Sequence, residues 1–418
     1  MLELATFALL SILIISIIEV GLHFMIRQFR KNFQWLITAQ DKLPNFSTTA
    51  LDRFLTHGFD PELGWARKPN TQAQESIGTV SETSKQYKKS AYHINYRGGR
   101  LNPGHEDLPL MISTYGDSFV FSRQVNDNET WQWFLSRLIH FNVLNFGVGN
   151  YGIDQALLRL KREYEQNRTP IVIMGVVPET IVRILSVWKH YSEYGNIFAF
   201  KPRFELKDDK LTLIRNVIDY KDKFLKIHKY LHHMQYYDYF YANKFSKDIL
   251  YFPYLISLSR SAHRNVPLIA ALLKKQLGTV LGKTETDNNR PWEMVLERNF
   301  EIVRDLYQSP DVVNLFLKIL EDFAAFGKQH EFHPVFLFMP YLHDIHYIKD
   351  HSCYYANFVS RAKEILHTID LTQPLMSSGN LNNLYSSDFY GGHLNKEGNE
   401  FISTIIAGEV VEFLPSDT

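Results

Sequence analysis

The sequence predicts an α/β fold with a parallel sheet that helices cover on both faces. Five short apolar runs bounded by turn residues indicate buried strands, at 110–115, 142–146, 170–177, 333–339 and 366–371. Helical patterns lie between them or after them, at 129–140, 153–167, 354–365 and 396–414. Short apolar strands that alternate with helices are typical of parallel sheets buried on both faces.

Composition limits the classes of function. The chain has 418 residues, of which 45% are hydrophobic and 14% aromatic, enough for a sizeable packed core. Its 45 Lys and Arg balance 45 Asp and Glu, so nothing in the net charge favours a nucleic-acid partner. The one cysteine, Cys353, excludes an internal disulfide and a metal site built from several cysteines.

The N-terminal segment has the length and composition of a membrane span. Leu4 to Ile18 contains no charge, and the apolar character continues to Ile26, broken only by Glu19 and His23. A bilayer needs roughly 20 such residues. No basic residue precedes the run and no small-x-small cleavage pattern follows it, which favours a span over a cleaved signal peptide. A buried core helix is the third alternative.

Two features complicate that span. Glu19 near its end is costly in lipid unless it reaches the interface. Arg27, Arg30 and Lys31 follow the span, and the positive-inside rule would place that end in the cytoplasm.

We expect five segments along the chain. They are a transmembrane anchor with its flank (1–31), a connector and lead-in (32–109), the first half of the core (110–196), a hairpin with a helical insertion (197–330), and the second half of the core (331–418). Asp208-Asp209 is the expected turn of the hairpin. The helical, strongly aromatic stretch after it is too long for a simple connection.

The candidate catalytic residues follow two of the predicted strands. Ser118 stands in Gly-Asp-Ser-Phe at 116–119, directly after the first strand, and His393 follows the last. Carboxyl ends of parallel strands share one edge of a sheet, so the two side chains can converge. A serine hydroxyl needs a base, and histidine is suitable because its ordinary pKa is near ~6.5. Asp388, the nearest upstream carboxylate, is the candidate third group that orients the base.

These motifs resemble those of the SGNH/GDSL hydrolase superfamily. The first block matches at 116–119, the second is similar to Asn-Phe-Gly-Val at 145–148, and the last is similar to His393-Leu394-Asn395 with Gly398. The resemblance implies a flavodoxin-like three-layer core, a Ser–His pair, and hydrolysis or transfer of an ester-linked acyl group. It implies no metal and no organic cofactor.

The lead-in also resembles a subgroup of that superfamily. The residues that carry this similarity are Gly64-Trp65, Lys68-Pro69-Asn70, Asn95, Gly98 and Arg100. They look like the lead-in of membrane-anchored members that are associated with bacterial envelope polysaccharides. The resemblance implies a single-pass anchor in the bacterial inner membrane and a globular part outside the cytoplasm, in the periplasm. It also implies a glycan substrate that carries an ester-linked acyl group, such as acetyl, and contact with polysaccharide machinery.

The chain departs from the family pattern in its supporting residues. Asn150, next to Gly149, stands where the family has a glycine whose amide binds the oxyanion, and asparagine tolerates left-handed backbone angles. Residues 175–179 lack the usual oxyanion asparagine, so we expect the Asn150 side chain to substitute for it. The family's acid position falls on Tyr390; either Asp388 serves instead or the site is a dyad. Asp117 is expected to support the serine turn.

Three other functions stay open. An O-acyltransferase would use the same Ser–His site, and a non-catalytic glycan-binding scaffold is a further alternative. Residues 147–152 spell G-x-G-x-x-G after a strand and before a helix, which is also the pattern of an NAD-binding oxidoreductase. That fingerprint normally follows the first strand of its unit, and here the strand at 110–115 precedes it.

Overall fold

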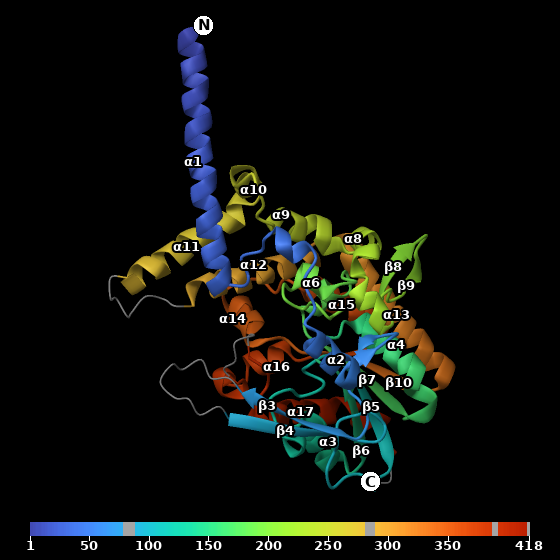
Figure 1. The fold of residues 1–418 in the computed structure, drawn as a ribbon. Coiled ribbons are helices and arrows are strands. Elements are labelled where there is room, and N and C mark those ends of the chain that lie inside the picture. The colour runs from blue at the N-terminus through green and yellow to red at the C-terminus, as the bar shows by residue number, and fades with distance from the viewer. Residues whose placement is uncertain (78–87, 281–288, 387–391, 416–418) are drawn as a thin grey trace. The chain divides into compact units, whose positions relative to one another are not determined.

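A computed structural model describes residues 1–77, 88–280, 289–386 and 392–415 (Figure 1). The chain forms two compact units. The smaller comprises Met1–Leu51, Ser186–Phe200 and Tyr220–Ile302, and the larger comprises Asp52–Leu185, Lys201–Asp219 and Val303–Thr418.

A five-stranded parallel sheet forms the centre of the larger unit, as predicted. Its strands are β5 (Leu110–Gly116), β6 (Asn142–Gly147), β7 (Ile171–Val176), β10 (His333–Phe338) and β11 (His367–Asp370). They lie in the order β11-β10-β7-β5-β6, and all four pairings are parallel. Counted along the chain this is the order 2-1-3-4-5 of doubly wound, flavodoxin-like sheets, whose ligands bind where the order reverses. The reversal lies at β5.

Helices cover both faces of this sheet. On one face α3 (Trp131–Ile139) and α17 (Lys396–Val410) pack together, and their apolar side chains form one buried cluster with those of the strands. On the other face lie α4 (Ile153–Glu163), α13 (Pro310–His330) and α15 (Ala356–Ile365), which contact β5, β7, β10 and β11. The three layers hold the carboxyl ends of the strands at one edge.

The boundaries of the two units differ from those of the segments expected from the sequence. The hairpin forms as predicted, from β8 (Arg203–Lys207) and β9 (Lys210–Ile214), with Asp208 and Asp209 at φ of 51° and 57° in its turn. It belongs to the larger unit, however, and so does α13, although the sequence groups both with the insertion at 197–330. The helix α13 packs against β10, which explains why it belongs to the core.

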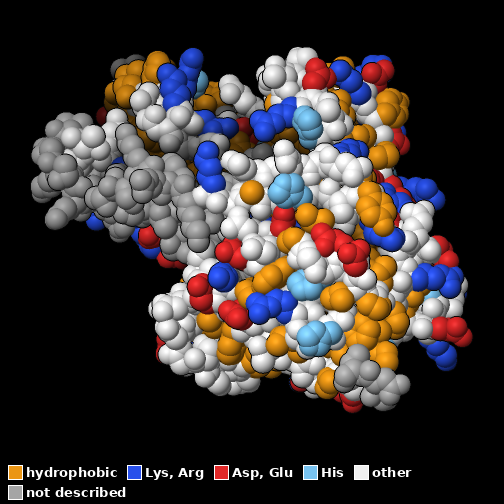
Figure 2. All heavy atoms as spheres, turned by 90° about the horizontal axis from the view of Figure 1, so that it is seen from below, with side chains coloured by type: hydrophobic (Ala, Val, Ile, Leu, Met, Phe, Trp, Pro, Cys, Tyr) orange, Lys and Arg blue, Asp and Glu red, His pale blue; other side chains and the backbone are white. Residues whose placement is uncertain are grey.

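The described chain contains further strands and helices. The strands are β1 (Phe59–Asp60), β2 (Gly64–Trp65), β3 (Thr71–Ile77) and β4 (Lys88–Ile94). The helices are α2 (Thr48–His57), α5 (Thr180–Arg183), α6 (Lys189–Ser192), α7 (Lys221–Leu225), α8 (Leu231–Tyr237), α9 (Ser246–Asp248), α12 (Arg290–Tyr307), α14 (Leu342–Asp350) and α16 (Thr372–Met376). On the face shown in Figure 2, Lys and Arg side chains are interspersed with Asp and Glu, and neither sign gathers in one patch.

The smaller unit contains the apolar N-terminal helix, α1 (Leu2–Asn32). By length and composition, Glu3–Asn32 can cross a membrane, and the same properties fit a signal sequence. The buried residues described in α1 are Glu19, near its middle, and Ile26 and Phe29, which pack with apolar side chains of α11 (Ala262–Val280). Beside α1 lies α10 (Tyr254–Arg260) (Figure 1).

Two glycines let the turn after β5 lie against neighbouring strands. A Cβ on Gly116, whose φ is +155°, would meet the backbone oxygen of Gly175 at 2.0 Å. A Cβ on Gly147 would meet the backbone nitrogen of Phe121 at 2.2 Å. Both distances are far below van der Waals contact, so only glycine permits these backbones to approach.

We expect Gly147→Ala to destabilise the larger unit by at least about 1–3 kcal/mol, because the new methyl group forces backbone to move. Gly408→Ala is the control: it lies in α17 with nothing within 4 Å of the new Cβ, and alanine should stabilise that helix by about 0.5–1 kcal/mol. Urea unfolding midpoints measure both. Equal midpoints for the two variants would contradict the close packing of the 117–121 turn on β6.

Candidate active site

Ser118 lies at the carboxyl end of β5, where the strand order reverses. The turn that carries it is closed by backbone hydrogen bonds: Phe121 N donates to Asp117 O at 2.9 Å, and Arg123 N donates to Ser118 O at 3.0 Å. The Ser118 side chain is nearly buried, with the residue 5% exposed. A tight turn between packed strands therefore presents a serine at the edge where ligands of such sheets bind.

His393 reaches this serine from the far end of the chain. Its Nε2 lies 2.9 Å from Ser118 Oγ, and the residue is 5% exposed. The ring also packs against Phe119, with 5.0 Å between the ring centroids. With the ring proton on Nδ1, Nε2 accepts the hydrogen bond of the serine hydroxyl, which is the arrangement a general base needs.

The residues around His393 hold its backbone in place. Ser386 donates to the His393 carbonyl from both its backbone nitrogen (2.8 Å) and its hydroxyl (2.9 Å). Asn395 caps α17, its Oδ1 accepting from Gly398 N at 2.9 Å. Asn399 Oδ1 accepts from Trp131 N on α3 at 3.2 Å. The His-x-Asn-x-x-Gly-Asn pattern thus positions the histidine relative to the sheet.

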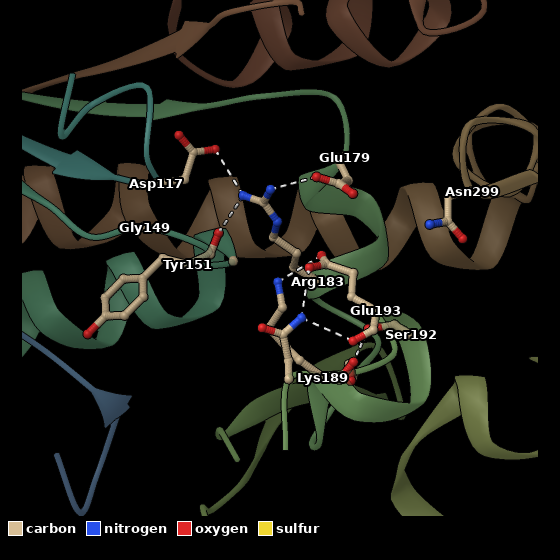
Figure 3. A network of polar contacts seen from close by, with 12 residues as sticks. Asp117, Gly149, Tyr151, Glu179, Arg183, Lys189, Ser192, Glu193 and Asn299 are labelled. Carbon is tan, nitrogen blue, oxygen red and sulfur yellow. Dashed lines mark hydrogen bonds and ion pairs between the residues drawn. The ribbon is translucent and has the colours of Figure 1, made fainter. Parts of the chain in front are cut away.

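Asp117 anchors the serine turn to the next strand of the sheet. The carboxylate is fully buried; its Oδ1 accepts from Phe119 N at 2.9 Å, and its Oδ2 accepts from Val177 N at 3.0 Å. Oδ2 also accepts from the Arg183 guanidinium at 3.3 Å (Figure 3). Burial raises the pKa of Asp117 above its ordinary value, while Arg183 and the two amides oppose that rise. Asp117 therefore connects the turn that carries Ser118 to the residue that follows β7.

Arg183 connects the loops that follow four strands. Besides Asp117 after β5, it donates to the Tyr151 carbonyl after β6 at 3.2 Å and to Glu179 after β7 at 2.6 Å (Figure 3). It also donates to the Tyr341 hydroxyl after β10 at 3.3 Å. Arg183 is 2% exposed, so a buried guanidinium joins the whole carboxyl edge of the sheet.

The turn after β6 holds Asn150 in a left-handed backbone conformation. Asn150 has a φ of +66°, in a turn closed by Tyr151 N donating to Val148 O at 3.2 Å. Trp65 Nε1 donates to the Gly149 carbonyl at 3.0 Å and fixes the orientation of that peptide. Within the described ranges, the backbone N–H groups of Ser118 and Asn150 donate to no protein acceptor. Both amides are thus available to a ligand.

The lead-in segment supports both turns. Tyr151 donates to the Trp65 carbonyl at 2.5 Å, which locks the two residues together beside Gly149. The buried Arg100 donates to the carbonyls of Phe121 (2.8 Å), Ser122 (2.7 Å) and Val125 (2.6 Å), directly after the serine turn. Trp65 and Arg100, which the sequence analysis named only for the family resemblance, therefore hold the two turns of the site in place.

Some site residues could not be anticipated from the sequence. Neither Arg183 nor Glu179 was among the candidates. The spacing of Glu179 and Arg183, i and i+4 directly after a buried strand, could have indicated an ion pair, because residues at this spacing lie side by side on a helix. Asp388 and Tyr390, the two positions considered for the acid, lie outside the described residues.

The dinucleotide alternative fits the geometry poorly. The backbone of Phe121 occupies the space that a side chain at position 147 would need. Close packing therefore explains why this position is glycine. At the start of α4, Gly152 N already donates to Gln155 Oε1 at 3.1 Å. The adjacent Asp154 is a buried carboxylate paired with Lys201 at 2.5 Å, and it would repel a pyrophosphate. Among the described side chains, no three His, Cys, Asp or Glu gather in a way that could hold a metal.

No known family and no curated protein matches the chain. The solved structures that are similar to this chain include two at 11% identity. One is a protein described as lipolytic and of the G-D-S-L family from Desulfitobacterium hafniense DCB-2, with a TM-score of 0.31 over 72% of this chain and 98% of that one. The other is a lipase/acylhydrolase from Enterococcus faecalis, with a TM-score of 0.36 over 74% of this chain and 99% of that one. Likenesses this distant carry no weight for fold or activity.

Removing the Arg183 guanidinium should strongly destabilise the larger unit. Arg183→Met leaves the buried Asp117 carboxylate without its partner, and breaking such a pair costs about 3–5 kcal/mol. The double variant Asp117→Asn/Arg183→Met should recover part of this loss, as measured by denaturant unfolding in a double-mutant cycle.

Arg168→Met is the matched control, because Arg168 and its partner Glu165 are 62% and 57% exposed. Its effect should stay below about 1 kcal/mol. An Arg183 variant that unfolds at the same denaturant concentration as this control would contradict a joining role for the guanidinium.

Proposed function

We propose that the chain is a serine ester hydrolase of SGNH type that works through an acyl-enzyme. The observation that carries the proposal is the 2.9 Å contact between Ser118 Oγ and His393 Nε2 at the carboxyl edge of the sheet. The backbone amides of Ser118 and Asn150, which donate to no acceptor within the described ranges, support it.

In the first half-reaction Ser118 Oγ attacks the carbonyl carbon of the ester. Its proton passes to His393 Nε2, and the carbonyl π electrons move onto the oxygen, which the amides of Ser118 and Asn150 stabilise. The oxyanion then re-forms the double bond, and the C–O bond to the alcohol breaks. His393 returns the proton to the departing alcohol oxygen, which leaves an ester between the acyl group and Ser118.

In the second half-reaction an acceptor hydroxyl attacks the acyl-enzyme. His393 takes the acceptor's proton, and the same amides stabilise the second oxyanion. Collapse expels Ser118 Oγ, which regains a proton from His393. With water the product is a carboxylic acid; with a sugar hydroxyl it is a new ester, so an O-acyltransferase is the same chemistry with a different acceptor. Product analysis with and without an acceptor glycan distinguishes them.

The proposed substrate carries a small acyl group, such as acetyl, on a cell-envelope glycan. The near-complete burial of Ser118 and His393, and the aromatic packing of Phe119 against His393 and Tyr341, support a small acyl group. The glycan and an envelope location, with α1 as membrane anchor and the globular part outside the cytoplasm, rest on the motif resemblance and on the apolar length of α1.

A fluorophosphonate probe should label the full-length protein at Ser118. Ser118→Ala should abolish labelling, and His393→Ala should slow it by about 10²–10⁴-fold, the usual contribution of a general base. Ser360→Ala, which changes an exposed serine on α15, should label like the parent protein. Labelling that persists in Ser118→Ala would sink the proposal, and no labelling of any variant would favour the glycan-binding scaffold.

Asn150→Gly should isolate the contribution of the Asn150 side chain. Glycine keeps the backbone amide and tolerates the φ of +66°, so only the side-chain donor is lost. If that donor stabilises the oxyanion, kcat for a soluble ester falls by about 10²–10³-fold while KM changes little. An unchanged kcat would show that the backbone amides suffice.

A further inference from the structure

The helix α11 is apolar on two opposite sides. Leu268, Ile269 and Leu272 are buried, and they pack in one cluster with Ile26 and Phe29 of α1. The outer side carries Val266, Pro267, Ala270, Leu273 and Leu277, whose spacing makes one stripe. On that stripe Val266, Leu273 and Leu277 are 50%, 38% and 59% exposed. A helix on a water-facing surface keeps its outer side polar, so this stripe requires another environment.

The start of α10 presents a second exposed apolar group. Phe252, directly before the helix, is 71% exposed, and Leu255 and Ile256 in its first turn are 38% and 49% exposed. Together with the α11 stripe, these side chains form what we call the 252–277 surface. It belongs to the same unit as α1.

Glu19 on α1 fixes the level at which α10 begins. Its carboxylate accepts from Tyr254 N at 2.6 Å and from Leu255 N at 2.9 Å, and the residue is only 7% exposed. One turn further along α1, His23 Nδ1 lies 3.1 Å from the Tyr254 hydroxyl. The first turn of α10 is therefore attached to α1 at residues 19–23.

The length of α1 places that level within a bilayer. At 1.5 Å per residue, roughly 20 residues cross a hydrocarbon layer of about 30 Å. A span that begins at Leu4 then ends near residue 23, beyond Glu19. The carboxylate would face lipid there, but Tyr254 N and Leu255 N of α10 donate to its two oxygens.

The charges around the 252–277 surface suit an anionic membrane. Residues 252–280 contain four cations, Arg260, Arg264, Lys274 and Lys275, and no Asp or Glu. Of these, Arg260 and Lys274 are exposed. Apolar side chains next to exposed cations are typical of helices that lie in the headgroup region of a membrane.

We propose that the 252–277 surface is seated in the lipid bilayer beside α1, and that α10 shields Glu19 from the hydrocarbon. The occupant of the surface is lipid, continuous with the lipid around α1. In Figure 1, α11 begins near α10 and runs obliquely past α1. The inference rests on α1 spanning the membrane and is independent of the esterase reaction.

Site-directed fluorescence on the full chain tests this seating. In a Cys353→Ser background, single cysteines replace Ile256, Leu277, Ile15 or Lys229 and carry a bimane label. The protein is reconstituted in vesicles of phosphatidylcholine and phosphatidylglycerol. Quenching by lipid-attached nitroxide reports contact with lipid, and quenching by iodide reports contact with water. Ile15 lies on the exposed apolar part of α1, and Lys229 is an exposed residue of the same unit.

Labels at 256 and 277 should behave like the label at 15, with strong nitroxide quenching and iodide quenching several-fold weaker than at 229. Iodide quenching at 256 and 277 equal to that at 229, with 15 in lipid, would overturn the seating while leaving the anchor intact. Protection from iodide without nitroxide quenching would mean that protein, such as a second copy, covers the surface, which also overturns it. Iodide access at 15 would refute the anchor and the seating together.

Discussion

The buried Arg183 guanidinium is the contact on which the site depends. It joins the loops after β5, β6, β7 and β10 through Asp117, the Tyr151 carbonyl, Glu179 and Tyr341. Taking a charge out of water is costly, and it is tolerated only where well-placed acceptors surround it. Because those acceptors come from separate strands, the same requirement that stabilises the cation also fixes the positions of the strand ends relative to one another.

The Ser118–His393 contact is a consequence of this framework. Ser118 lies in a turn that Asp117 connects to Val177, directly after β7. Arg100 donates to the Phe121 carbonyl of the same turn, and Gly147 leaves room for the backbone of Phe121. His393 arrives from the other end of the chain, set by the cap and side-chain contacts at the start of α17. Trp65 orients the turn that carries Asn150. The lead-in is therefore part of the site, although it contributes no side chain to the proposed chemistry.

Much of this could be predicted from the sequence, because the information was local. Each strand of a sheet buried on both faces is a continuous apolar run, so 110–115 and 170–177 were recognisable, and the edge rule then brought Ser118 and His393 together. The role of Arg183 was not recognisable, since a single arginine acquires its partners only when four loops converge. The division into units also escaped prediction, because the membership of α13 depends on its packing against β10, a contact between segments distant in sequence.

The most direct test of the central claim is mass spectrometry of the acyl-enzyme. The full-length protein is mixed with a soluble acetyl ester, quenched in acid after a short interval, digested and sequenced by fragmentation. The account predicts one acetyl group on the peptide that contains Gly116 to Arg123, located on Ser118 and lost with time as the acceptor attacks. Acetylation confined to lysines, or turnover of the ester while Ser118 stays unmodified at every interval, would contradict it.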